Sequence, residues 1–249
     1  MQFYQVFLYL AFGILPSLTW LFYYLRKDLH PEPKRMILKI FFYGALITIP
    51  VLFIQIGLSR FLVYGQDYGF FIQHPLLVQI IRWFFIVALT EELFKYAVVR
   101  LSILHSGELD EPLDIMLYMV VGALGFAAVE NVLYLFLPNT GLSLDIIITT
   151  TVTISFIRFI GATFLHTLCA ALVGYFLARA TLKAHHGKQL VIIGLVLATF
   201  LHGLYDFSII RLSEPFSFLI PVGILIVLTG FMMYDFDEIK KVKSICKLN

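Results

Sequence analysis

Seven ionisable side chains lie within four long stretches of otherwise apolar sequence, and this pattern constrains the fold more than any other feature. They are Glu91, Glu92, Lys95, Glu130, His166, His202 and Asp206. A charged group at the centre of a membrane-spanning helix costs about 2.5–3.5 kcal/mol on insertion scales. The carboxylates and the ammonium group would together cost on the order of 10 kcal/mol, as much as the whole stability of a domain. The pattern therefore predicts one buried polar site to which several membrane helices contribute.

The composition agrees with a membrane protein. Hydrophobic residues make up 60% of the 249 residues and charged residues only 14%, so a soluble fold would lack the polar groups to cover its surface. The formal net charge of +2 gives no indication of nucleic-acid binding. We expect the lipid bilayer to surround the chain, and residues 1–249 to form a single integral membrane domain.

The apolar stretches predict an all-α fold, a polytopic transmembrane helix bundle. A helix needs about 20 mainly apolar residues to span a bilayer. About seven spans are expected, at residues 3–25, 36–58, 76–99, 115–137, 159–178, 189–209 and 216–234.

The positions of Lys and Arg predict the orientation, because cytoplasmic loops contain an excess of them. Basic residues cluster at residues 26–35, around residues 179–188 and in the tail from residue 240. With seven spans, all three clusters fall on one side. The opposite side has only Arg60, Arg82, Arg158 and Arg211 in or near its loops. We therefore expect the N-terminus outside the cell and the C-terminus in the cytoplasm.

Residues 144–157 do not fit a simple scheme of seven straight spans. They are apolar but rich in Thr, and together with residues 159–178 they are too long for one straight span. A further full span would reverse the last two loops and violate the distribution of basic residues. We expect a re-entrant or interfacial helix that breaks near Arg158 and Gly161. One long tilted helix is the alternative.

Two acids and a base lie close together in the third expected span. Glu91 and Lys95 are four residues apart, and Glu92 and Lys95 three, so both pairs can meet on the helix surface. Adjacent Glu91 and Glu92 point about 100° apart, so one can face a site while the other contacts a second helix. The cluster suits general acid/base catalysis. Its structural alternative is a buried ion pair that holds helices together.

The fourth and fifth spans each add one ionisable side chain. Residues 122–128 are rich in Gly and Ala, which let membrane helices approach closely. Close approach would bring Glu130 within reach of a neighbouring helix, and Asn131 could hydrogen-bond across helices or to a substrate backbone. His166 follows in the fifth span. A packing motif around Glu130 and a hydrogen-bonded core histidine are the structural alternatives.

The sixth span contains His202 and Asp206, four residues apart and therefore on one helical face. This spacing suits an Asp that orients an imidazole, or two ligands of one metal ion. The structural alternatives for the separate spans are not independent, because each buried charge needs another as its partner.

In this order the residues resemble the PrsW family of intramembrane proteases. The resemblance rests on Glu-Glu-x-x-Lys at 91–95, Phe-x-x-x-Glu at 126–130, His166, His-x-x-x-Asp at 202–206, and an acidic Pro-Glu-Pro loop at 31–33. It extends over about residues 20–210. It implies hydrolysis of peptide bonds in or near the membrane, a membrane-anchored protein or peptide as substrate, and a bacterial cell membrane as the location.

That family is similar to the wider group of CAAX proteases and bacteriocin-processing enzymes, with Glu-Glu-x-x-x-Arg, Phe-x-x-x-His and His-x-x-x-Asn/Asp motifs. Here Lys95 lies one position earlier than the Arg of that group, and Glu130 stands where the group has His. The chain also lacks the His-Glu-x-x-His signature of many zinc proteases. The assignment of the catalytic base and of the metal ligands therefore has two alternatives.

Both alternatives use the same candidate catalytic residues, with Lys95 and Asn131 in supporting roles. The candidates are Glu91, Glu92, Glu130, His166, His202 and Asp206. In the first alternative, Glu91 or Glu92 is the general base, aided by His166, while His202 and Asp206 stabilise the oxyanion. In the second, which we favour, Glu130, His166 and His202 bind Zn²⁺, Glu91 is the base, and Asp206 is a further ligand or supports one.

Three other functions are compatible with the same residues. Chains of Glu, His and Asp inside membranes also mark proton relays and transporters, although the sequence has no inverted repeat and seven spans do not divide into equal halves. A seven-span metal-dependent lipid hydrolase could use a similar site. A non-catalytic membrane scaffold is the remaining alternative.

Overall fold

The computed structural model describes residues 3–26, 32–66, 71, 73–104, 109, 111–136, 143–182 and 186–240, with the backbone alone for 66 and 235–240. The basic tail from residue 241, Lys183 and residues 27–31 of the first basic loop lie outside these ranges. All regular structure in the described residues is helical, and no strand occurs among them. The all-α fold class predicted from the sequence is confirmed.

Six helices in the described part of the chain are long and apolar enough to cross a membrane, with α7 and α8 counted together. They are α1 (Phe3–Leu25), α2 (Lys34–Gln66), α6 (Pro112–Leu135), α7 (Leu144–Ile160) with α8 (Ala162–Leu182), α9 (Gly187–Arg211) and α10 (Phe216–Lys240). Each overlaps one expected span. The helix α2 extends furthest beyond its expected range of 36–58.

The third expected span consists of three consecutive helical segments, α4 (Pro75–Ile80), the π-helix η1 (Ile81–Leu89) and α5 (Thr90–Ser102). The residues at the two junctions, Ile81 and Leu89, have right-handed helical dihedral angles, so the three segments form one continuous rod. A π-helix is rare and is frequently found at functional sites. Here η1 ends at Leu89, two residues before Glu91, the first of the paired acids.

The helix α6 is the core of the bundle. In its most apolar stretch 89% of the residues are buried, against 56% or less in the other candidate spans. Glycines permit this burial by close approach: a Cβ on Gly125 would lie 2.0 Å from the carbonyl oxygen of Phe41 in α2. On the other side, a Cβ on Gly174 of α8 would lie 2.8 Å from the Cα of Met116. The expected role of small residues in helix packing is confirmed at these contacts.

The rod formed by α7 and α8 breaks at Gly161, where the break was expected. Gly161 has φ −93° and ψ −94°, outside the helical region. A side chain there would collide with the Tyr205 hydroxyl, which lies 2.4 Å from the position of a Cβ. Nearby, the indole N–H of Trp20 donates to the carbonyl of Phe159 at 3.0 Å, which ties the broken segment to α1. The position of α7 relative to the bilayer stays a prediction.

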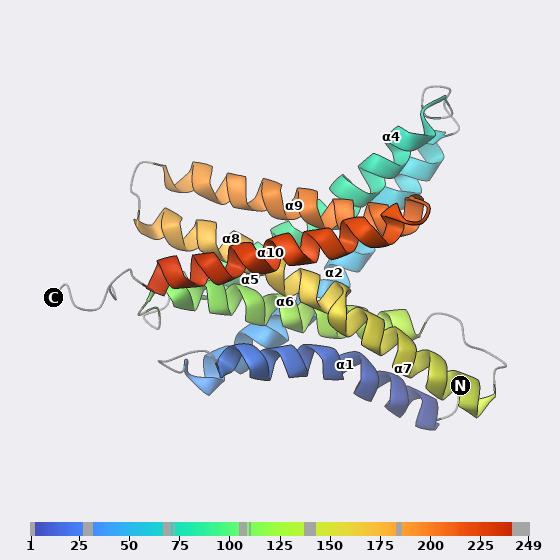
Figure 1. Ribbon diagram of the computed structural model, residues 1–249, viewed down its shortest axis with the longest axis horizontal. Coiled ribbons are helices and arrows are strands. Elements are labelled where there is room, and N and C mark those ends of the chain that lie inside the picture. Colours follow the sequence, from blue (N-terminus) through green and yellow to red (C-terminus); the bar gives the residue numbers. More distant parts are fainter. Residues whose placement is uncertain are drawn as a thin grey trace.

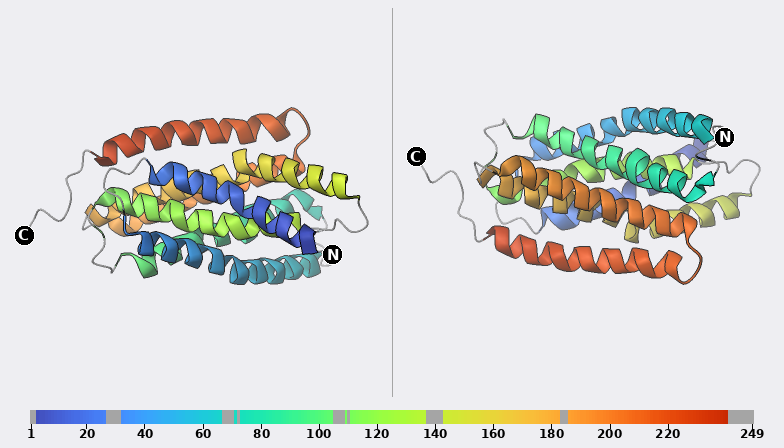
Figure 2. Two further views of the ribbon diagram at one scale, coloured as in Figure 1. Left: turned by 90° about the horizontal axis from the view of Figure 1, so that it is seen from below. Right: turned by 90° about the horizontal axis from the view of Figure 1, so that it is seen from above.

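The helices run back and forth along one long direction (Figures 1 and 2). The helix α1 begins at one end of the bundle and α10 ends at the other, as an odd number of crossings requires. At the end where α1 begins, α7 lies beside α1, while α4 lies beside the last turns of α2 (Figure 1). The two groups diverge from the centre, where α5, α6, α8 and α9 come together.

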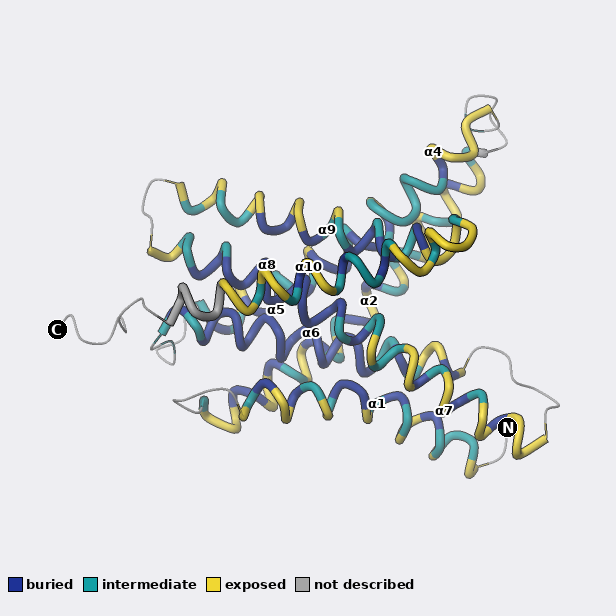
Figure 3. Tube along the Cα trace, in the orientation of Figure 1, coloured by how far each residue is buried: buried dark blue, intermediate teal, exposed yellow. Residues whose placement is uncertain are grey.

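Burial increases from the periphery to the centre of the bundle (Figure 3). The outward-facing residues of the outer helices are large and apolar, for example Phe22, Phe53, Phe156 and Val227, each more than 60% exposed. A soluble protein rarely exposes so continuous an apolar surface. This surface therefore fits a helix bundle surrounded by lipid.

Candidate active site

The structure brings all seven ionisable side chains singled out in the sequence into one cluster at the centre of the bundle. The helix α5 contributes Glu91, Glu92 and Lys95, α6 contributes Glu130, α8 contributes His166, and α9 contributes His202 and Asp206. Each makes at least one contact of 2.8–3.9 Å between a nitrogen and an oxygen atom within the cluster. The charges thus solvate one another, as their location in apolar helices demands.

The ammonium group of Lys95 lies in the middle of the cluster and is fully buried. Its Nζ donates to Oε1 of Glu92 and to Nδ1 of His166, both at 2.8 Å, and lies 3.5 Å from Oε2 of Glu91. The ring of Phe126 covers it at 4.9 Å. Lys95 therefore neutralises part of the negative charge of the paired acids.

His202 is held between the two acids of α5. Its Nδ1 lies 2.8 Å from Oε1 of Glu92, and a carboxylate only accepts, so Nδ1–H is the donor. The other ring nitrogen, Nε2, lies 3.8 Å from Oε2 of Glu91 and 3.4 Å from Oδ2 of Asp206. The Nε2 lone pair of a neutral ring therefore faces Glu91 and Asp206.

His166 has the same arrangement with its two nitrogens exchanged. Its Nε2 lies 2.8 Å from Oε2 of Glu130, so Nε2–H donates to that carboxylate. Its Nδ1 accepts from Lys95 and lies 3.9 Å from Oε2 of Glu91. The two imidazole rings are perpendicular, with centroids 5.2 Å apart. Each histidine thus has one nitrogen bonded to a carboxylate and one directed toward Glu91.

Glu130 belongs to a second network that reaches α7. Its Oε2 also accepts from Arg158 at 2.7 Å, and the same guanidinium donates to the side-chain oxygen of Asn131. The amide of Asn131 donates to Thr163 at 2.9 Å. Asn131 therefore links α6 to α7 and α8, and its contact in this structure is with other helices.

Glu91, His166 and His202 form a group whose ligand atoms all lie within 4.8 Å of one another. The Oε2 atom of Glu91 is buried and has no hydrogen-bond partner among the described residues, although it faces both histidines. An oxygen and two imidazole nitrogens are donors suited to Zn²⁺. A carboxylate on the far nitrogen of each histidine is the usual support of a metal-bound imidazole. These residues therefore fit a metal ion, provided that Lys95 releases Nδ1 of His166.

The grouping differs from the ligand set Glu130, His166 and His202 expected from the sequence. The donor atoms that lie close together include one of Glu91 and not one of Glu130, which bonds to Nε2 of His166 and is paired with Arg158. Spacing along the chain could not distinguish the two acids, since both lie at a depth close to that of the histidines. Which of the two acids lies near both histidines depends on the direction from which its helix approaches them.

Two contacts of the site were missed or given little weight in the sequence. Gln55 of α2 donates to Oε1 of Glu91 at 3.1 Å and thereby fixes that carboxylate. The sequence feature that could have revealed Gln55 is a single amide side chain in an otherwise apolar span. From the sequence, Arg158 could either pair with a carboxylate or lie at the membrane interface, and the structure shows the pairing, with Glu130.

The cluster is sealed on one side and accessible on the other. Glu91, Glu92, Lys95, His166 and His202 are buried. The side chains of Glu130 and Asp206 are 20% and 24% exposed, and that of Arg158 is 11% exposed. The partly exposed side of the cluster is therefore the side that carries Asp206, Glu130 and Arg158.

Comparison with known proteins points to one family. A family model described as PrsW family intramembrane metalloprotease matches residues 32–234. The chain is 31% identical over 217 residues to Protease PrsW of Oceanobacillus iheyensis, which covers 87% of this chain and 90% of that protein. It is 28% identical over 218 residues to Protease PrsW of Bacillus subtilis, with 87% and 89% covered. No solved structure matches the chain.

Proposed function

The chain belongs to the PrsW family of intramembrane metalloproteases, and from this we propose that it hydrolyses peptide bonds of membrane-anchored proteins or peptides at the cluster around Glu91. The main supporting observation is the buried Oε2 atom of Glu91. It lacks a hydrogen-bond partner in the described structure and faces the two histidine nitrogens that are not bonded to Glu92 or Glu130.

Glu91, His166 and His202 are the residues that would hold the metal ion, with Zn²⁺ the ion best suited to them. When bound, such an ion supplies Lewis-acid activation of water and of the scissile carbonyl. The charges of the cluster support a divalent cation. Four carboxylates face two cationic side chains, Lys95 and Arg158, so the formal charge with neutral histidines is −2.

Asp206 is the proposed general base in this arrangement. It lies 3.4 Å from Nε2 of His202 and is the more exposed of the carboxylates, so it can meet the attacking water. A base must lie within hydrogen-bond reach of the proton that it takes. If Glu91 acts without a metal ion, its Oε2 atom, which accepts no hydrogen bond from the described residues, is the base instead.

Glu92, Glu130 and Lys95 act as positioning residues. Glu92 and Glu130 each hold one histidine by its outer N–H, and Lys95 holds Glu92. Arg158 lies at the accessible side, where its guanidinium packs on the ring of Tyr134 at 3.9 Å. We propose that this side admits the substrate, because the other approaches are closed by buried side chains.

We also propose a bacterial cell membrane as the location, with the N-terminus outside. Relatives in Oceanobacillus and Bacillus support a bacterial origin. The distribution of basic residues supports the orientation.

Metal content and cleavage together test the proposed function. Glu91→Gln, His166→Ala and His202→Ala are each expected to abolish both the bound metal, measured by mass spectrometry of the purified protein, and the cleavage of co-expressed single-span proteins. Glu214→Gln is the matched control, because Glu214 is an exposed acid between α9 and α10. Folded variants that keep the parent's metal content would refute the ligand set, and a chelator without effect on cleavage would refute the metal mechanism.

A further inference from the structure

A groove between α5, α8 and α9 lies away from the active-site cluster, toward the end of the bundle where α5 ends and α9 begins. It has a volume of about 530 Å³, within the usual range for sites that bind small molecules. The groove arises because α9 diverges from the rod that contains α5. The two are closest at η1, where a Cβ on Gly203 would lie 2.8 Å from the ring of Phe84, and they share few contacts beyond it.

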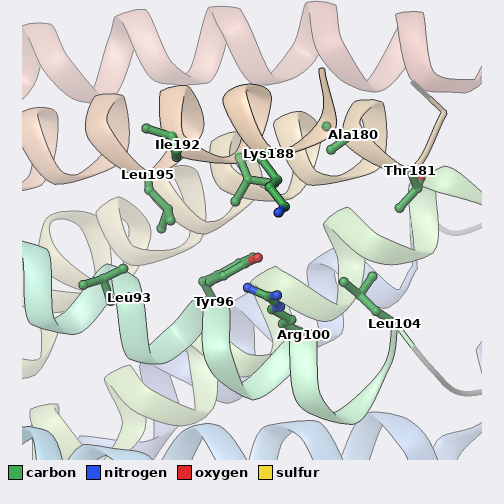
Figure 4. Close-up of a pocket in the computed structure, with 11 residues that line it drawn as sticks. Leu93, Tyr96, Arg100, Leu104, Ala180, Thr181, Lys188, Ile192 and Leu195 are labelled. Atoms are coloured by element: carbon green, nitrogen blue, oxygen red, sulfur yellow. The ribbon is translucent and has the colours of Figure 1, made fainter. Parts of the chain in front are cut away.

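Three polar groups converge on this groove (Figure 4). The guanidinium of Arg100, the hydroxyl of Tyr96 and the amino group of Lys188 point toward one another across it. Neither Arg100 nor Lys188 forms an ion pair with an acid of the described residues. Two cations with no anion between them form an electrostatic site for a negatively charged group.

The rest of the groove is apolar. Leu93, Ile192 and Leu195 line it on the side nearer the middle of the bundle (Figure 4). Leu93 and Ile192 are exposed on the outer surface of two helices that this protein places in a membrane, so the groove opens toward lipid. A ligand of this groove needs a negative group at one end and an apolar chain at the other.

We propose that the groove binds an anionic glycerophospholipid, with its phosphate between Arg100 and Lys188 and one acyl chain along Leu93, Ile192 and Leu195. The orientation expected from the sequence puts this end of the bundle at the cytoplasmic face. Basic pockets between transmembrane helices on that face are typical sites for anionic headgroups. The lipid site is independent of the proteolytic activity.

Lipid titration followed by native mass spectrometry tests the proposal on the full-length protein in detergent. Dioleoyl-phosphatidylglycerol is expected to bind more tightly than dioleoyl-phosphatidylcholine. The double variant Arg100→Gln/Lys188→Gln is expected to raise the dissociation constant of phosphatidylglycerol by about tenfold or more, since each cation near a headgroup contributes to binding. Binding of phosphatidylcholine is expected to stay as in the parent.

A matched control removes two other cations near the same end of the bundle. Lys34→Gln/Arg35→Gln changes two exposed residues at the start of α2 and is expected to leave phosphatidylglycerol binding unchanged. Ile192→Trp keeps both cations of the groove and obstructs only the acyl chain, and it is expected to weaken the lipid as well. Ile192 is 59% exposed, so the protein should fold with either side chain.

The outcomes separate the alternatives. Unchanged binding in Arg100→Gln/Lys188→Gln, or an equal loss in Lys34→Gln/Arg35→Gln, overturns the proposal. Unchanged binding in Ile192→Trp overturns the placement of the acyl chain. Displacement of phosphatidylglycerol by inorganic phosphate or by a hexaglutamate peptide shows that the groove recognises an anion alone, which also overturns it. Glu91→Gln is expected to bind the lipid as the parent does, so a failure of the protease proposal is distinguishable from a failure of this one.

Discussion

At the scale of single residues, the chemistry of the site depends on which nitrogen of each histidine is already engaged. Glu92 holds His202 by Nδ1, and Glu130 holds His166 by Nε2. The remaining nitrogens are the ones that approach Glu91. Glu91 and Glu130 have the same side chain but different positions. Glu91 belongs to the group of possible metal-binding atoms, whereas Glu130 bonds to the far nitrogen of His166.

The substitution Glu130→Gln tests this difference. An amide can still accept from His166, but it lacks the charge that favours a metal-bound imidazole. Loss of such a supporting carboxylate typically lowers metal affinity about 10–100-fold without removing the site. We expect that decrease in a zinc titration of Glu130→Gln, while Glu91→Gln binds no zinc at any concentration tested. The opposite result would restore Glu130 to the ligand set expected from the sequence.

The substitution Lys95→Met tests whether the ammonium group of Lys95 is needed to neutralise the buried carboxylates beside it. It leaves Glu92 buried without its cation, and breaking a buried ion pair from one side costs about 3–5 kcal/mol. We expect a clear decrease in the thermal unfolding midpoint of the purified protein. The double variant Glu92→Gln/Lys95→Met removes both charges and is expected to recover part of the loss. Equal midpoints for the parent and Lys95→Met would show that Lys95 is not required to neutralise the acids.

At the scale of helices, the position of α6 decides whether the site can form. Gly125 of α6 lets α2 approach almost to backbone contact, and Gly174 of α8 does the same for α8, so that Glu130 of α6 lies beside His166. The break at Gly161 then turns α7 so that Arg158 can reach Glu130. Both features depend on the absence of a side chain at a particular contact.

Two Gly→Ala substitutions distinguish close packing from helix propensity. Ala stabilises a helix interior by about 1 kcal/mol relative to Gly. Gly223→Ala in α10 should show this gain or no change, because nothing lies within 4 Å of a Cβ there. In Gly125→Ala the Cβ would lie 2.0 Å from the carbonyl oxygen of Phe41, and we expect a net loss of about 1–3 kcal/mol in the free energy of unfolding. Similar stabilities of the two variants would contradict the packing seen between α2 and α6.

At the scale of the whole molecule, the helices run back and forth along the bundle, and α10 ends at the opposite end from where α1 begins. The active-site cluster lies between these ends, where the helices α5, α6, α8 and α9 meet. Its two partly exposed acids, Glu130 and Asp206, mark the side of the cluster that is open.

Cysteine labelling tests the orientation. In a Cys246→Ser background the remaining thiol, Cys169, is buried and should not react. Arg60→Cys, near the end of α2, is expected to react with a membrane-impermeant maleimide in intact cells. Lys34→Cys, at the start of α2, should react only after permeabilisation, because both positions are exposed on opposite ends of one helix. The reverse pattern would show that the N-terminus faces the cytoplasm.

Much of this protein could be predicted from the sequence because a bilayer penalises charge and unpaired backbone groups strongly. Each apolar stretch therefore predicts a membrane-spanning helix, and each ionisable side chain within such a stretch predicts a polar group on a neighbouring helix that pairs with it. The all-α fold, the approximate spans, the break near Gly161 and the membership of Glu91, His166 and His202 in one polar cluster follow from that penalty.

Only the tertiary structure decided which groups face one another. Glu91, Glu92 and Glu130 are chemically equivalent in the sequence, and their roles depend on the rotation and lateral approach of α5 and α6. Those are fixed by contacts between residues distant in the chain, such as Gly125 with Phe41, Gly161 with Tyr205, and Gln55 with Glu91. The local penalty of the membrane acts on each helix separately, whereas packing acts between helices, so spacing along one helix cannot reveal which face of its neighbour it will meet.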